Sequence, residues 1–148
     1  MGIAITLSDE KTREIVSSLL CSAFEGGSNY WYRIDGYVWP KGKTRKDLEA
    51  EKAKHPDKFE RTFYPHFETP IMGGAVKVRD MEGDKGVVVL DWAKCERALQ
   101  LMLDGKGGAH HGANLLYDIN GDCLGCKTDA ETGDVFLQLA LWGEVIYG

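Results

Sequence analysis

The sequence has no long hydrophobic run, and this excludes a membrane-spanning helix. The longest apolar stretches are residues 87–90 and 135–141, the second interrupted by Gln138, whereas a helix that crosses a bilayer needs about 20 apolar residues. The first ten residues lack a basic segment and turn acidic at Asp9 and Glu10, which argues against a secretory signal. We therefore expect no membrane association and a cytoplasmic location.

The sequence also has no low-complexity tract or internal repeat, and only four of its 148 residues are proline. Its composition, 43% hydrophobic and 28% charged, is typical of a globular protein. We predict one domain over residues 1–148. Within it, residues 40–72 contain all four prolines and form an irregular or exposed helical excursion.

Positive charge is not in excess, because 18 Lys and Arg face 23 Asp and Glu, for a net charge of -5. This argues against general nucleic-acid binding, which depends on neutralising phosphates with Lys and Arg. The balance is uneven, however. Residues 41–61 have eight basic and five acidic side chains (net +3), which leaves 10 basic and 18 acidic ones (net -8) elsewhere. The sequence is therefore compatible with a local basic face at residues 41–61.

No complete catalytic motif is present. Residues 105–108 are Gly-rich but lack the Gly-Lys-Ser/Thr ending of a phosphate loop, and residues 118–129 lack the terminal Glu of a calcium loop. Acidic pairs stand at predicted helix starts, where they complement the helix dipole: Asp91 with Glu96, and Glu131 with Asp134. We predict a non-enzymatic binding protein.

The sequence does contain apolar residues at helical spacing and short β-rich segments. They predict helices between Ser8 and Gly26, from Asp91 to Gly105, from Ala109 to Tyr117 and from Asp129 onward, with an exposed helix at 44–54. They predict strands at 3–7, 29–39 (with a bulge or turn at Asp35-Gly36), 75–79 and 87–90. The fold class is α+β, with a small antiparallel sheet of about four strands packed against two to four helices.

The last predicted helix is apolar nearly all round, since Leu137 and Leu141 add to a face that already includes Val135, Phe136 and Leu139. Such a helix is either buried or in contact with another subunit. We predict a buried C-terminal helix and a homo-oligomer.

The segment from Glu25 to Arg33 holds the parts of a nucleotide site. Glycines allow close backbone approach, aromatic rings stack on bases, Asn reads a base edge and Arg pairs with phosphate. The candidate ligand-binding residues are Gly26, Gly27, Ser28, Asn29, Trp31, Tyr32, Arg33 and, from the basic stretch, Arg45.

Strand alternation divides this segment into two faces. Tyr30 and Tyr32 share one face, and Trp31 and Arg33 share the other, where we expect the ligand beside Asn29. The alternative is a glycine helix stop that leads into an aromatic core strand.

Cys123-Leu-Gly-Cys126 has the spacing of a zinc knuckle, and His110 and His111 upstream complete a possible zinc-ligand set. Adjacent histidines are expected to point in different directions, so one of them need not reach the metal. The alternative is two reduced thiols in an exposed loop. The remaining cysteines, Cys21 and Cys95, lie in helical patterns, and reduced thiols are expected throughout.

Two segments together, Glu25-Gly-Gly-Ser-Asn-Tyr-Trp31 and Asp129-Ala-Glu-Thr-Gly-Asp-Val-Phe-Leu-Gln-Leu-Ala-Leu-Trp-Gly-Glu-Val-Ile-Tyr-Gly148, resemble those of a small protein family common in tailed phages and prophages. The resemblance extends to the central hairpin and the helix that begins at Asp91, and it leaves out about 40–72. It implies a phage origin and the host cytoplasm, and it assigns no catalytic residues. The loop from Tyr117 to Lys127 is longer than the family's usual link.

Small phage proteins of this kind are often accessory factors that act on the host. The resemblance and the candidate pocket together lead us to expect an anti-defence sponge, which sequesters a nucleotide second messenger such as a cyclic nucleotide made by bacterial immunity. One alternative is an inhibitor or adaptor that binds a host enzyme through residues 41–69. Another is a zinc-containing nucleic-acid accessory protein.

Overall fold

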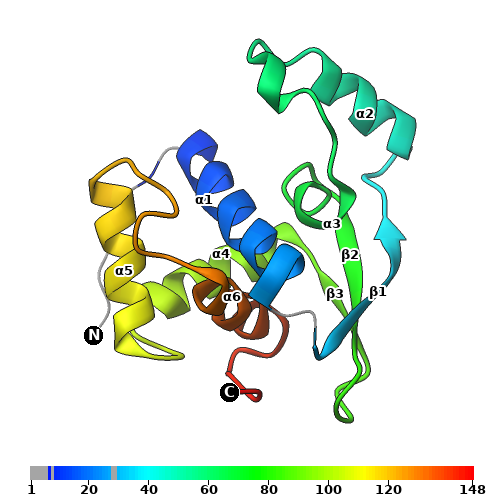
Figure 1. Ribbon diagram of the computed structural model, residues 1–148. Helices are drawn as coiled ribbons and strands as arrows, with labels where there is room; N and C mark the ends of the chain where they lie inside the picture. Colours follow the sequence, from blue (N-terminus) through cyan, green and yellow to red (C-terminus); the bar gives the residue numbers. More distant parts are fainter. Residues whose placement is uncertain (1–6, 8, 28–29) are drawn as a thin grey trace.

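The computed structural model describes residue 7, residues 9–27 and residues 30–148 (Figure 1). In chain order the elements are α1 (Asp9–Ser22), the π-helical turn η1 (Ala23–Gly27), β1 (Tyr32–Val38), α2 (Arg45–Ala53), the 3-10 turn η2 (Lys58–Glu60), α3 (Pro65–Glu68), β2 (Ala75–Asp80), β3 (Val87–Leu90), α4 (Trp92–Leu103), α5 (Ala109–Asn120) and α6 (Ala130–Trp142). The fold is α+β, as predicted. Residues 3–6 of the expected first strand lie outside the described residues, and Leu7 is not in a strand.

The sheet has three antiparallel strands in the order β1-β2-β3. The register of β1 against β2 shifts between Ile34 and Gly36, which confirms the bulge predicted at Asp35-Gly36. In β2 the buried Val76 and Val78 alternate with the exposed Lys77, because one face of the sheet packs on the helices. In Figure 1 the helices α1, α4, α5 and α6 lie to one side of the sheet.

Helix α6 lies at the centre of the molecule. It packs against α1, η1, α4 and β3, and all its residues from Thr132 to Leu141 are buried. Burial within this chain therefore accounts for the nearly all-round apolar pattern of the helix. The predicted buried C-terminal helix is confirmed, and the homo-oligomer stays a prediction.

The crossing of α6 with α1 depends on a glycine. A Cβ atom at Gly133 would lie 2.6 Å from the Ala23 backbone nitrogen and 2.8 Å from the Leu19 carbonyl oxygen. Real Cβ atoms do not approach backbone so closely, so only glycine lets the two helices come this near. The segment after α6 is held by Gln138, whose Oε1 accepts hydrogen bonds from the backbone of Ile146 and Tyr147, each at 2.8 Å.

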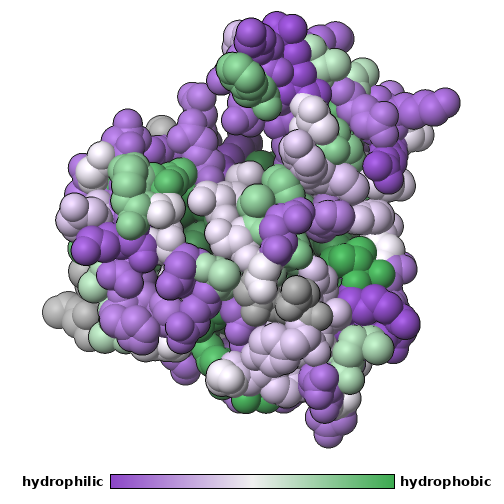
Figure 2. All heavy atoms as spheres, in the orientation of Figure 1, coloured by the Kyte–Doolittle hydropathy of each residue, from purple (hydrophilic) through white to green (hydrophobic). Residues whose placement is uncertain are grey.

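The excursion between β1 and β2 contains α2, η2 and α3, and α2 with η2 projects from the body (Figure 1). Thr44 and Asp47 form a capping box at the start of α2, and Leu48 is the only buried residue of that helix. The predicted exposed helix is therefore confirmed. Figure 2 shows the projecting part as mostly hydrophilic. Among the described residues, no helix is long and apolar enough to cross a membrane.

Candidate functional site

Trp31 does not lie on an exposed ligand face, and this corrects the prediction. It is fully buried, its Nε1 donates to Asp134 Oδ1 at 2.6 Å, and its ring lies 5.0 Å from that of Trp142. The reason is that β1 begins only at Tyr32, so strand alternation does not extend back to Trp31. The expectation of an aromatic core segment holds for this residue.

The other candidate residues of this segment separate. Tyr32 is half-buried, and its hydroxyl donates to the Phe24 carbonyl oxygen at 3.0 Å. Arg33 is exposed on the opposite face of the sheet, where its Nε lies 3.1 Å from Asp35 Oδ1. Gly26 and Gly27 end the π-helical turn. Ser28 and Asn29 lie outside the described residues.

A different set of aromatic side chains gathers where β1 ends. The rings of Tyr37 and Trp39 stack with 5.3 Å between centroids and 17° between planes. The hydroxyl of Tyr37 lies 3.3 Å from His66 Nδ1 on α3. All three side chains are partly exposed. We call these residues, together with Arg45, the Trp39 surface.

Arg45 is the candidate residue from the basic stretch that joins this surface. It is the first residue of α2 and pairs with Glu49 one turn later, with Nε 2.9 Å from Oε1. Burial raises the pKa of Tyr37, and the charge of Arg45 acts against that rise, which places the guanidinium in electrostatic reach of the phenol. Lys41 and Lys43 precede Arg45 in an exposed turn. The surface therefore combines stacked rings with nearby cations, two of which are paired: Arg45 with Glu49 and Lys43 with Glu51.

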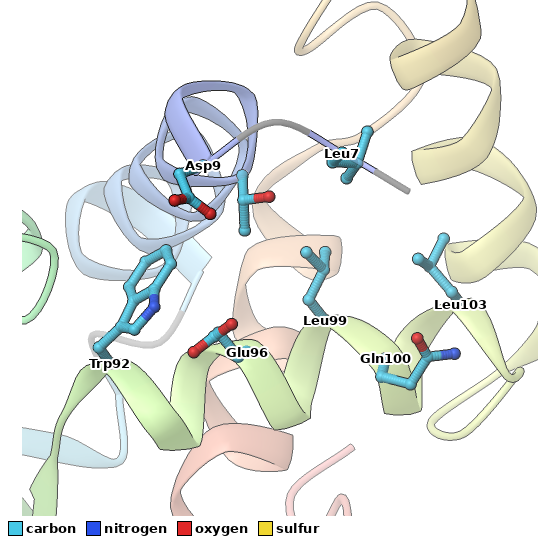
Figure 3. A pocket seen from close by; sticks show the side chains of 8 residues that line it. Leu7, Asp9, Trp92, Glu96, Leu99, Gln100 and Leu103 are labelled. Carbon is cyan, nitrogen blue, oxygen red and sulfur yellow. The ribbon is translucent and has the colours of Figure 1, made fainter. Parts of the chain in front are cut away.

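Two grooves among the described residues lie away from this surface, and Trp92 lines both of them. One has a volume of about 360 Å³ between α1 and α4, and in Figure 3 the carboxylates of Asp9 and Glu96 point into it beside the Trp92 indole. The other has a volume of about 430 Å³ and is lined by Arg13, Glu51, Ile71, Met72, Gly73 and Trp92. Two carboxylates at the first groove oppose a phosphate, so neither its charge nor its position fits the predicted nucleotide site.

The predicted zinc set is not assembled as expected. Cys123 and Cys126 are joined to each other in a disulfide, so their sulfur atoms are not metal ligands in this structure and the prediction of reduced thiols is wrong for this pair. Cys21 and Cys95 are free, as predicted. The two histidines do come together, with 4.0 Å between ring centroids. They share a cluster with Glu131 instead.

Both histidine rings lie close to Gly108, the N-cap residue of α5. A Cβ atom there would lie 3.1 Å from His110 Cε1 and 3.4 Å from His111 Cδ2, and Gly108 adopts φ +125°, a conformation that favours glycine. The expectation that adjacent histidines point in different directions is wrong here. Burial lowers the pKa of His111, as does the neighbouring His110.

The cysteine loop is organised by Asp118, which is fully buried. Its carboxylate accepts hydrogen bonds from the backbone of Gly125 (3.1 Å), Lys127 (2.7 Å) and Thr128 (3.0 Å), and one from the Thr128 hydroxyl (2.7 Å). Burial acts to raise the pKa of Asp118, but these hydrogen bonds outweigh it and lower the pKa. The acid that resembled a calcium ligand thus serves as a structural acceptor.

Two residues that contact the candidate aromatic side chains could not be recognised from the sequence. Asp134, predicted to complement a helix dipole, is buried on Trp31 and Gln138. His66 is one of two isolated histidines in the proline-rich connection and has no spacing to mark it. His66 contacts Tyr37 only because α3 packs next to the end of β1.

Comparison of the chain with protein families, with curated proteins and with solved structures finds no match in any of the three.

Proposed function

We propose that this protein is a non-enzymatic binding protein for an anionic, aromatic ligand of the nucleotide class, and that the ligand binds at the Trp39 surface. The observation that carries the proposal is the stacked pair of Tyr37 and Trp39, partly exposed, together with Arg45, whose charge acts on Tyr37. An aromatic face binds a base by stacking, which contributes about 1–3 kcal/mol per base. An arginine binds phosphate through charge-assisted hydrogen bonds.

The cations next to Trp39 support the choice of an anionic ligand. Lys41 and Arg45 are exposed within six residues of the ring, and Lys43 pairs with Glu51 across the turn. The start of α2 adds the positive end of a helix dipole. A phosphate placed here would meet the charges of Lys41 and Arg45, and it would compete with Glu49 for Arg45 and with the capping carboxylate of Asp47 for the start of α2.

The resemblance to phage proteins suggests the biological role of such a binding protein. A phage protein that binds a nucleotide without converting it suits the role of an anti-defence sponge, which acts in the host cytoplasm on a second messenger. His66 and the Tyr37 hydroxyl then serve as hydrogen-bonding groups for the base or sugar. The protein acts by affinity and stoichiometry, so no catalytic group is required.

Calorimetry with a panel of cyclic dinucleotides, cyclic oligonucleotides and cyclic ADP-ribose isomers tests the proposal. Trp39→Ala and Arg45→Ala should each weaken binding about tenfold or more, given the value of one stacked base or one charged hydrogen bond. Arg33→Ala is the matched control, because Arg33 is an equally exposed arginine on the opposite face of the sheet. Absence of heat and of any thermal shift across the panel would remove the proposal.

A second candidate is a protein-binding inhibitor or adaptor, and one observation favours it. Phe59 is 81% exposed at η2 on the projecting excursion, and Lys58 lies over its ring at 5.1 Å. Large exposed aromatic residues are frequent anchors of protein interfaces. Pulldown from a host lysate with the wild type and Phe59→Ser distinguishes the two functions. A stoichiometric protein captured by the wild type and lost in Phe59→Ser would favour the inhibitor.

A further inference from the structure

His110, His111 and Glu131 form a cluster that the nucleotide proposal does not use. Each offers one ligand atom, and these atoms all lie within 4.8 Å of one another. The two histidines stand in the first turn of α5 and Glu131 in the first turn of α6. The cluster therefore joins two helices through side chains that are typical metal ligands.

One tautomer of His111 accounts for the hydrogen bonds around Thr132. The Thr132 hydroxyl donates its one hydrogen to Asp129 Oδ1 at 3.1 Å. The same oxygen lies 3.1 Å from His111 Nδ1, and when its hydrogen is used at Asp129 it accepts from Nδ1. In this tautomer Nδ1 is protonated, and Nε2 carries the lone pair.

This tautomer leaves two acceptors facing each other. His111 Nε2 lies 3.7 Å from Glu131 Oε1, and neither atom brings a hydrogen when the imidazole is neutral. A cation placed between them satisfies both. The hydrogen bond from Nδ1 to a fixed oxygen is also the usual support for a histidine that binds a metal through its other nitrogen.

We propose that His110, His111 and Glu131 bind a divalent transition metal ion of the zinc type. Two imidazoles and one carboxylate are a ligand set that zinc accepts, and they leave a fourth position for water or an external ligand. Nickel, cobalt and copper bind similar sets. Cys123 and Cys126 take no part.

The three ligand atoms must move only slightly closer together to bind a metal ion. Ligand atoms in a tetrahedral zinc site lie about 3.3 Å apart, so the three side chains must move inward from their present separation. His111 is buried and fixed by Thr132, whereas His110 and Glu131 are exposed and adjust by rotation about their side-chain bonds.

Local charge favours the cation. Glu131 and Asp129 place two carboxylates next to His111, and the charges of both act on its ring. The starts of α5 and α6 oppose a cation through their dipoles, but that effect is confined to the first turn and weakened by water. Two full negative charges, one of them on a direct ligand, outweigh it.

The test is titration of the oxidised protein with ZnCl₂ by calorimetry, with Co²⁺ absorption as a second readout. We expect one zinc per chain. Glu131→Gln and His110→Asn should each weaken binding at least about tenfold, since even supporting residues of metal sites are worth that much. Both side chains are exposed, so both variants should keep the far-ultraviolet circular dichroism of the wild type.

Three control variants distinguish binding at this cluster from binding elsewhere on the chain. Glu10→Gln removes a carboxylate at the second residue of α1, the place that Glu131 occupies in α6, and it should bind zinc as the wild type does. His55→Asn removes an exposed histidine elsewhere, and Cys123→Ser/Cys126→Ser removes the cysteines. Both should bind normally. Zinc affinity unchanged in Glu131→Gln and His110→Asn, loss of binding in the cysteine variant, or no zinc binding at all would overturn the proposal.

Discussion

Trp31 donates its indole hydrogen to Asp134 Oδ1 at 2.6 Å, in a buried site that joins residues 103 positions apart. The two residues belong to the two segments on which the resemblance to phage proteins depends. Those segments therefore lie against one another, because η1 packs on α6 and Trp31 packs on Trp142. Packing of the two segments on one another accounts for the burial of Trp31 without ligand binding.

Replacing Trp31 tests this structural role. Trp31→Phe keeps an aromatic ring but removes the donor to Asp134, so a buried carboxylate loses one hydrogen bond. We expect the free energy of unfolding to fall by about 1–3 kcal/mol, measured by urea denaturation. Ligand affinity of the folded variant should be unchanged. A variant as stable as the wild type that no longer binds ligand would place Trp31 in the site instead.

Two glycine replacements should differ in their effect on stability. Gly133→Ala introduces a Cβ atom 2.6 Å from the Ala23 nitrogen, and overpacking of this kind costs about 1–3 kcal/mol. That cost exceeds the gain of about 1 kcal/mol that alanine brings to a helix. Gly26→Ala is the control, because its Cβ would meet only the Ala130 Cβ atom at 3.8 Å. Thermal unfolding should show a lower Tm for Gly133→Ala alone.

The buried carboxylate of Asp118 should make stability depend on pH. Its pKa in the folded chain lies below the ordinary value of 3.8, so its contribution is fully present above that value and is lost as the pH falls through the folded pKa. We expect Asp118→Asn to be less stable at pH 7 and to lose less stability between pH 5 and pH 2. Asp84→Asn, an exposed carboxylate in the β2–β3 loop, is the control. Urea midpoints measured against pH would contradict this expectation if the two variants had parallel profiles.

The disulfide between Cys123 and Cys126 predicts a simple alkylation pattern. Iodoacetamide applied to the folded, unreduced protein should label neither of these cysteines. Cys95 should also stay unlabelled, since burial raises the pKa of its thiol far above neutrality. Mass spectrometry after trypsin digestion gives the answer. Alkylation of Cys123 without a reductant would show that the pair is reduced, as the sequence alone led us to expect.

Much of the fold was predictable from local signals. The N-caps at Asp91 and Asp129 each bind a backbone nitrogen three residues later, and the bulge at Asp35-Gly36 follows from the glycine. These features depend on neighbours in sequence, which is why the sequence predicts them. Helix α5 continues to Asn120, beyond the predicted Tyr117. Its last turn is held by Asp118, which binds the backbone of the following loop, and the spacing of apolar residues does not reveal such a contact.

The candidate site was less predictable, because it depends on contacts between distant residues. Strand alternation placed Trp31 beside Arg33, whereas the strand starts one residue later and Trp31 turns toward α6. Of the predicted ligand residues, Arg45 joins the Trp39 surface. His66 reaches Tyr37 from 29 residues away. No pattern within one segment contains that information.

Native mass spectrometry of the protein purified from host cells tests the central claim most directly, because it reports bound small molecules and bound proteins together. We predict a nucleotide-class ligand retained by the wild type and by Arg33→Ala, and lost from Trp39→Ala and Arg45→Ala. A wild-type chain that carries no small molecule and instead retains a stoichiometric host protein would contradict the claim.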